Sequence, residues 1–213
     1  LENGFNVEYL LTVHPPTGSY MYHVPATRVV SLVAESIGIG LIEIEPEFEI
    51  PGDVDSGEQG DKEVKCIKNS LMEMADEIHL KGIIAGAVES EYQRSRIQKM
   101  CDELDIVLYA PLWKSDPLVM INKMVETGFE IMIVSVAADG MEESWLGRYI
   151  DNNAIVELKA INEKYGVHIL GEGGEYETLV TNGPHMNRRV EIEYDVFWEQ
   201  NWGEIRVKNA WLN

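Results

Sequence analysis

A glycine-rich acidic segment, GEGGEYETLV at residues 171–180, has the composition of a site for a cationic group. Its carboxylates, Glu172, Glu175 and Glu177, repel one another at this spacing unless a cation, a metal ion or a shared proton joins them. If residues 175–180 form a strand, Glu175 and Glu177 share one face and Tyr176 occupies the other. The segment predicts a site for Mg²⁺, which prefers oxygen ligands, or for an ammonium or quaternary cation beside an aromatic wall. An acidic β-bulge in solvent is the structural alternative.

Two further segments fall in predicted loops after strands, where open α/β sheets place their ligands. His23 ends the aromatic segment SYMYH at residues 19–23 and is a candidate polar contact for a nucleotide, or else an ordinary loop histidine. Gly86 lies in the segment AGA at residues 85–87, whose small side chains leave room for a ligand. The predicted helix that follows begins with free N–H groups, which suit an anion.

Tyr92, Arg94 and Arg96 lie near the start of this predicted helix. Tyr92 and Arg96 are an i,i+4 pair and therefore share a face. Either arginine can hold a phosphate through two hydrogen bonds. The alternative is a solvated helix on which the arginines pair with neighbouring glutamates, and the sequence leaves both interpretations open.

A tryptophan among charged residues distinguishes the segment GMEESWLGR at residues 140–148. Trp145 is either a core anchor or one wall of a ligand site. Arg148 can pair with Glu142 or Glu143, or it can bind a carboxylate or a phosphate. This segment is therefore a second candidate for contact with a substrate.

Strands and helices alternate along the first half of the chain, which is typical of a parallel sheet wound by helices. Gly4 has the position of a helix C-terminal stop, and we expect natural sequence upstream of Leu1. Residues 46–60 are acidic and rich in Gly and Pro, which predicts a surface loop. The predicted strands are residues 7–13, 40–44, 82–88 and 106–109, and the predicted helices are residues 26–37, 61–80 and 90–104.

The pattern loosens after Pro111, which predicts two domains, residues 1–113 and residues 114–213. The second domain mixes helices with strands and a hairpin, as in an α+β domain. Its predicted helices are residues 116–127 and 152–165, and its predicted strands are residues 129–137, 167–170, 175–180, 188–200 and 204–212.

The 213 residues include 17 Lys and Arg against 37 Asp and Glu, for a net charge of −20 at pH 7. Because nucleic-acid binding depends on basic residues that neutralise phosphates, we expect no nucleic-acid partner. Cys66 and Cys101 lie far apart, which argues against a zinc ribbon, an iron–sulfur cluster or a redox dithiol. No apolar run reaches about 18 residues and no signal pattern is present, so we expect a cytoplasmic protein with no membrane partner.

In chain order, SYMYH, AGAVESEYQRSRI, PLW, GMEESWLGR and GEGGEYETLVTNGP resemble successive blocks of the diphthine–ammonia ligase family, over about residues 9–184. The resemblance implies an α/β fold: a HUP-like parallel sheet wound by helices binds the nucleotide, and a smaller C-terminal α+β domain carries the EGGE-type motif. It also implies ATP-dependent amidation of diphthine on translation elongation factor 2 to diphthamide. In that reaction ATP adenylates the diphthine carboxylate, pyrophosphate leaves, and ammonia displaces AMP.

The cofactors implied are ATP and Mg²⁺, and the partners are elongation factor 2 in its diphthine form and ammonia; a homo-oligomer is left open. A quaternary ammonium group on diphthine fits the acidic segment beside an aromatic ring. On this chain, the resemblance assigns catalysis to Glu172, Glu175 and Glu177, nucleotide binding to His23, Gly86, Tyr92, Arg94, Arg96, Gly173 and Gly174, and substrate binding to Glu142, Glu143, Trp145, Arg148 and Tyr176, with no metal ligand named.

The sequence departs from the family in one respect. The SGGKDS-like phosphate-binding loop is not in it, and we expect that loop upstream of Leu1. One alternative is another PP-loop-type ATP pyrophosphatase, but a tRNA-thiolating enzyme would need reactive cysteines and a basic surface. The other alternative is a non-catalytic HUP-fold nucleotide-binding protein, which would have no use for the acidic segment.

Overall fold

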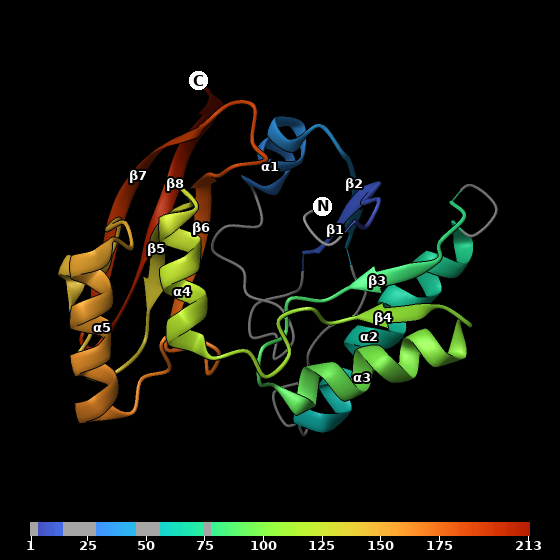
Figure 1. Cartoon of the computed structure of the whole chain (residues 1–213), viewed down its shortest axis with the longest axis horizontal. Coiled ribbons are helices and arrows are strands. Elements are labelled where there is room, and N and C mark those ends of the chain that lie inside the picture. The colour runs from blue at the N-terminus through green and yellow to red at the C-terminus, as the bar shows by residue number, and fades with distance from the viewer. Residues whose placement is uncertain (1–3, 15–28, 46–55, 75–77) are drawn as a thin grey trace. The chain divides into compact units, whose positions relative to one another are not determined.

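The protein is described by a computed structural model that covers residues 4–14, 29–45, 56–74 and 78–213 (Figure 1). The chain forms two compact units. One draws on residues 1–10, 25–42 and 116–213, and the other on residues 11–24 and 43–115. The mixed α/β class predicted from the sequence is confirmed. His23 and most of the predicted acidic loop lie outside the described residues.

The unit centred on residues 43–115 alternates helices and strands as predicted. It contains α2 (Ser56–Glu73), β3 (Gly82–Ile84), α3 (Glu91–Glu103) and β4 (Val107–Tyr109). β3 and β4 pair in parallel. α3 begins where the Ser90 hydroxyl accepts a hydrogen bond from the Gln93 N–H (3.3 Å), as N-cap residues do.

Among the described residues, the strands of this part of the chain form two small sheets, and the continuous HUP-like parallel sheet stays a prediction. β1 (Tyr9–Val13) pairs only with β2 (Gly40–Ile44) among these residues, and β3 pairs only with β4. The strands are also shorter than predicted, because residues 85–88 leave the extended ladder and lead into the cap of α3. The sheets in this part of the chain are therefore small.

The other unit is built on a four-stranded antiparallel sheet with the order β6-β5-β8-β7 (Figure 1). Two of its helices begin at an aspartate: the side chains of Asp116 and Asp151 accept the N–H groups of Val119 and Ala154, as N-cap residues do, and so begin α4 and α5. Gly166, with φ 78°, ends α5, as glycine often does at a helix C-terminus. The elements are α4 (Pro117–Glu126), β5 (Glu130–Val136), α5 (Asn152–Tyr165), β6 (Tyr176–Asn182), β7 (Val190–Glu199) and β8 (Trp202–Leu212).

The core of this unit lies between β5 and the helices. Ile133 and Val136 on β5 are fully buried, and Leu158 on α5 packs into the same cluster. Burying an aliphatic side chain of this size stabilises the folded state by about 1.5–3 kcal/mol. The central strand β5 is thus packed into the core, and the loops at the ends of the sheet begin and end on packed strands.

The short helix α1 (Val30–Ile37) belongs to this unit, although it comes early in the chain. The buried Ser36 hydroxyl accepts the Arg188 N–H (3.1 Å) and donates to the Arg188 carbonyl. The Ser36 carbonyl accepts the backbone N–H of Asn187 (2.8 Å) and its side-chain amide (3.0 Å). These bonds join α1 to the β6–β7 connection.

One predicted strand is absent. Residues 167–170 form no ladder and instead turn directly into the acidic segment. The predicted hairpin is confirmed as β7 and β8, which pair from Val190–Leu212 to Glu199–Trp202. The reason for the missing strand is found in the loop itself.

Candidate functional site

The carboxylate of Glu175 closes the acidic loop by accepting backbone hydrogen bonds. Its Oε1 accepts the N–H of His168 (2.9 Å) and its Oε2 accepts the N–H of Gly173 (2.8 Å). The Glu175 carbonyl in turn accepts the N–H of Ala137 (2.8 Å), which ties the loop to the end of β5. Each of the two carboxylate oxygens of Glu175 thus accepts a backbone N–H group of its own loop. Glu175 therefore has a structural role in addition to any role toward a ligand.

The ring of His168 provides a second acceptor inside the same loop. Its Nδ1 accepts the N–H of Leu170 (3.2 Å) and the N–H of Glu172 (3.4 Å). The accepting Nδ1 carries no proton, so the neutral ring has its proton on Nε2. His168 was not among the residues predicted for the site, because the sequence pattern predicts a strand at residues 167–170. A histidine four residues before the first glutamate of a glycine-rich segment was the signal available.

Local geometry accounts for the glycines of the loop. Gly171 and Gly174 have φ of +70° and +79°, in the left-handed region that favours glycine. A Cβ at Gly171 would overlap the Tyr176 carbonyl oxygen, and a Cβ at Gly173 would lie 2.9 Å from the Glu175 carboxylate. The backbone of the loop itself thus favours glycine at residues 171 and 174, whether or not a ligand approaches it.

Tyr176 does not offer an open aromatic wall. Its side chain is 2% exposed, and its hydroxyl donates a hydrogen bond to the Ile169 carbonyl. Burial raises the pKa of Tyr176 well above its usual value. The ring anchors the acidic loop to the core. Glu177, one residue further along β6, is half-buried.

The tryptophan loop at residues 140–148 is also fixed from within. Trp145 is 4% exposed and belongs to the core, as one of the two interpretations proposed. The Arg148 guanidinium lies 4.5 Å from the centre of the Trp145 ring and forms two 2.7 Å hydrogen bonds with Glu157 on α5. Arg148 thus pairs with Glu157 instead of Glu142 or Glu143, both of which are exposed.

Tyr92 and Arg96 share a face of α3, as predicted, and that face packs on α2. The Arg96 guanidinium stacks 3.8 Å from the centre of the Tyr92 ring and its Nε lies 2.9 Å from Asp61. A Cβ at Gly60 would overlap the Tyr92 hydroxyl. Burial is the main cause that raises the pKa of Tyr92. Both side chains therefore contribute to the packing of the two helices.

Arg94 and Gly86 lie near the carboxyl ends of β3 and β4. The Arg94 guanidinium is 4.7 Å from the centre of the Trp113 ring, and the nearest Arg94–Glu91 approach is 4.0 Å. Gly86 is exposed, and a Cβ there would meet nothing within 4 Å. Among the described residues, Gly86 and Arg94 are therefore more open to a nucleotide than Tyr92 and Arg96.

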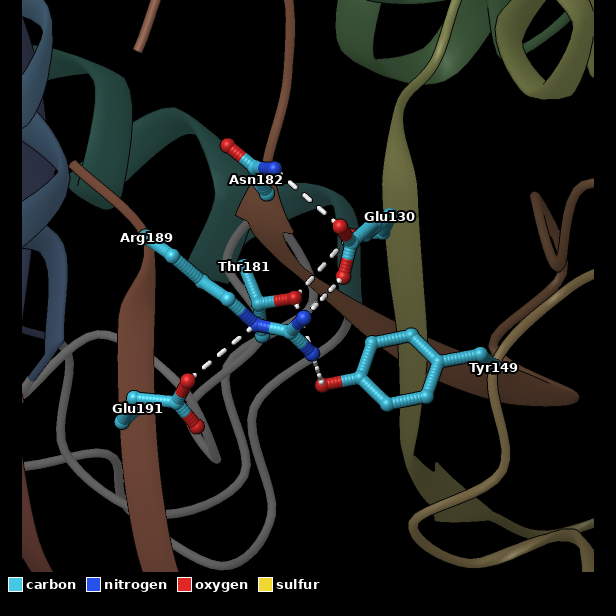
Figure 2. Close-up of polar contacts among 6 residues, drawn as sticks. All are labelled: Glu130, Tyr149, Thr181, Asn182, Arg189 and Glu191. Atoms are coloured by element: carbon cyan, nitrogen blue, oxygen red, sulfur yellow. Dashed lines mark hydrogen bonds and ion pairs between the residues drawn. The ribbon is translucent and has the colours of Figure 1, made fainter. Parts of the chain in front are cut away.

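A polar cluster that the sequence analysis missed is centred on Arg189 (Figure 2). Its guanidinium contacts Glu130 on β5 (2.9 Å), Glu191 on β7 (3.4 Å) and the Tyr149 hydroxyl (3.0 Å). The hydrogen bond with the Tyr149 hydroxyl is the main cause that raises the pKa of Arg189, and the charges of Glu130 and Glu191 add to it. Figure 2 also shows Thr181 and Asn182 of β6 completing the network. The cluster joins three strands and has the character of a structural tie.

The three predicted catalytic glutamates do not form a metal site by themselves. No group of three or more His, Cys, Asp or Glu residues in the described ranges is arranged to hold a metal ion. The carboxylate of Glu175 accepts the N–H groups of His168 and Gly173 instead. Within the same ranges, no helix combines the length and the apolar character needed to cross a bilayer.

Comparisons with known proteins match nearly the whole chain. The model of the diphthamide synthase N-terminal domain matches residues 1–108, and that of the diphthamide synthase C-terminal domain matches residues 116–212. The diphthine–ammonia ligase of Danio rerio is 32% identical over 185 residues, which cover 82% of this chain and 69% of that protein. The Homo sapiens protein of the same name is 31% identical, with 82% and 66% covered.

The relative from Schizosaccharomyces pombe, also named diphthine–ammonia ligase, is 30% identical over 95% of this chain but only 34% of its own length. The chain thus spans about two thirds of the Danio rerio and Homo sapiens relatives and about a third of the yeast protein. Both domain models occur in the expected order, and the second contains the acidic loop. The chain belongs to the diphthamide synthase (diphthine–ammonia ligase) family.

Proposed function

We propose that the protein is an ATP-dependent ligase that amidates diphthine on translation elongation factor 2 to give diphthamide. The observation that carries the proposal is the match of both diphthamide synthase domains, in order, together with relatives named diphthine–ammonia ligase. In the proposed reaction, a diphthine carboxylate oxygen attacks the α-phosphorus of ATP and pyrophosphate leaves. Ammonia then attacks the acyl carbon, the bond to AMP breaks, and the amide forms.

We propose that ATP binds at the carboxyl ends of β3 and β4, in a HUP-like arrangement. Three features support this position: the parallel pairing of the strands, the exposed Gly86 with open space at its Cβ position, and Arg94 nearby. Ligands of open parallel sheets bind at this edge. Tyr92 and Arg96 support the position indirectly, since they hold α3 against α2.

The trimethylammonium group of diphthine is proposed to meet carboxylates of the acidic loop, with Glu172 and Glu177 as the contacting residues. Both are half-buried, where a carboxylate attracts a cation more strongly than in open water. Mg²⁺ is expected to arrive with ATP, because the described residues supply no three-ligand site and Mg²⁺ often binds through substrate phosphates. Elongation factor 2 is the protein partner proposed for this acidic chain.

The test is an amidation assay with the full-length protein, diphthine-bearing elongation factor 2, ATP, Mg²⁺ and ammonium. We expect AMP and an amidated histidine in equal amounts, measured by chromatography and mass spectrometry of the modified peptide. Neither product should form when ammonium or the diphthine form of the factor is omitted. AMP formation with a tRNA substrate, or tight ATP binding without turnover in the complete mixture, would count against the proposal.

A further inference from the structure

The acidic loop is shaped by two side-chain acceptors at its ends. The Nδ1 of His168 accepts the N–H groups of Leu170 and Glu172, and the Glu175 carboxylate accepts the N–H groups of His168 and Gly173. We propose that His168 is a positioning residue which, with Glu175, fixes this loop so that Glu172 meets the substrate. The contact between Glu172 and diphthine rests on the function proposed above, whereas the role of His168 in fixing the loop does not.

The geometry ties the histidine ring directly to the proposed contact residue. The backbone N–H of Glu172 points at Nδ1 (3.4 Å), and the N–H of the next residue, Gly173, points at Glu175 (2.8 Å). Two successive peptide units are therefore held by two different side chains. A change at either acceptor releases one of these units and, with it, the direction of the Glu172 side chain.

A glycine-rich loop needs such acceptors to keep one shape. Glycine has more backbone freedom than any other residue, and fixing a residue's backbone costs about 1–2 kcal/mol. The segment 171–174 contains three glycines. Further bonds within the loop join the Gly171 N–H to the His168 carbonyl (3.0 Å) and the Gly174 N–H to the Gly171 carbonyl (2.9 Å). His168 thus takes part in four of the bonds that define the turn: two through its ring, one through its carbonyl and one through its N–H.

The His168 ring is partly buried, and the residues on both sides of it in the chain belong to the core. His168 Nε2 is buried from solvent, and the flanking residues Val167 and Ile169 are 4% and 8% exposed. The loop is anchored on its other side by the buried Tyr176, whose hydroxyl reaches the Ile169 carbonyl. His168 therefore stands between two core residues while its Nδ1 faces the loop backbone.

Asparagine provides the matched substitution, because its Oδ1 can occupy the place of Nδ1 and accept hydrogen bonds but brings no ring. We therefore compare His168→Asn with His168→Ala in the full-length protein, and use His185→Ala, at an exposed histidine of the same unit, as the control. Backbone hydrogen exchange at Leu170 and Glu172 is followed by NMR without any substrate. We expect at least tenfold faster exchange at both positions in His168→Ala, near-native exchange in His168→Asn, and no change in the control.

The second measurement is steady-state amidation. We expect His168→Ala to raise the KM for the diphthine form of elongation factor 2 at least tenfold while the KM for ATP stays the same, and His168→Asn to restore most of the loss. Unchanged exchange in His168→Ala, or an asparagine variant no better than alanine in exchange, would overturn the proposal. Faster exchange with an unchanged KM for the factor would also overturn it. If the wild-type protein does not amidate diphthine, the proposed function fails, while the exchange data still decide whether His168 fixes the loop.

Discussion

Arg148 and Glu157 form a two-pronged ion pair, with both guanidinium–carboxylate distances at 2.7 Å. The hydrogen bond from Arg148 is the main cause that lowers the pKa of Glu157. The same guanidinium lies over the Trp145 ring, so a single side chain joins the tryptophan loop to α5. An arginine that the sequence offered as a ligand contact is thus committed to holding its own loop in place.

Replacing this arginine should loosen the tryptophan loop. We expect Arg148→Ala to lower the free energy of unfolding by about 1 kcal/mol, since it removes a partly exposed ion pair and a cation–π contact. Arg148→Lys should recover only part of this loss, because an ammonium group cannot form the paired hydrogen bonds. Urea unfolding at pH 7 measures the difference. Glu143→Gln in the same loop is the control and should change nothing; a full recovery by lysine would contradict this account.

Removing the Ser36 hydroxyl should weaken the attachment of α1. The substitution Ser36→Ala removes a buried hydroxyl and leaves the Arg188 N–H and carbonyl, which are partly buried in these bonds, without that partner. An unsatisfied buried group of this kind costs about 1–3 kcal/mol. We expect a loss of that size in chemical unfolding, with faster amide exchange along α1. Ser144→Ala, at an exposed serine of the same unit, should leave both measurements unchanged, and equal behaviour of the two variants would refute the role of Ser36.

Two glycines with similar backbone angles should respond differently to alanine. Gly128 has φ +89° and open space at its Cβ position, so Gly128→Ala should cost only about 1–2 kcal/mol, the penalty of a left-handed residue. Gly171 has φ +70°, but a Cβ there would also overlap the Tyr176 carbonyl oxygen. We therefore expect Gly171→Ala to destabilise the protein clearly more than Gly128→Ala in thermal unfolding. Equal losses would mean that the acidic loop adapts to a side chain.

Cys101 should be chemically inert in the folded protein. It is fully buried, and burial is the main cause that raises its pKa to about 11. In the variant Cys66→Ser, Cys101 is the remaining thiol. At pH 8 only about a thousandth of this thiol is ionised, and the thiolate is the form that reacts. We expect no reaction with a disulfide reagent until urea is added. Rapid labelling of the folded variant would show that α3 opens readily.

The same group gives a prediction for alkaline pH. A thiol whose pKa is raised on folding stabilises the protein fully below its unfolded pKa of about 8.5. That contribution is lost as the pH rises toward about 11, the pKa in the folded state. Between about pH 8.5 and pH 11, the melting temperature of Cys101→Ala should therefore fall less than that of the wild-type protein. Parallel curves for the two proteins would argue against a buried thiol.

Local signals were sufficient for much of the secondary structure. Asp116, Asp151 and Gly166 each act within a few residues of the helix ends that they define, so α4 and α5 could be placed from the sequence. The β7–β8 hairpin was likewise predicted as two neighbouring strand segments with Trp202 and Gly203 near the turn. The blocks of the family could also be recognised without coordinates, because they depend only on residue types and their order.

Tertiary structure decided which partners the polar side chains have. The segment 167–170 resembles a strand, yet Glu175 and His168 capture its N–H groups and turn it into a loop. Ser36 meets Arg188 across 152 residues of chain, and Arg148 finds Glu157 instead of its nearest glutamates. The sequence shows that carboxylates gather at residues 172–177, but only folding brings backbone N–H groups to Glu175. The pairings of Ser36 and Arg148 depend on how separate segments pack, and those of Glu175 and His168 depend on the exact path of the loop backbone; residue spacing alone contains neither.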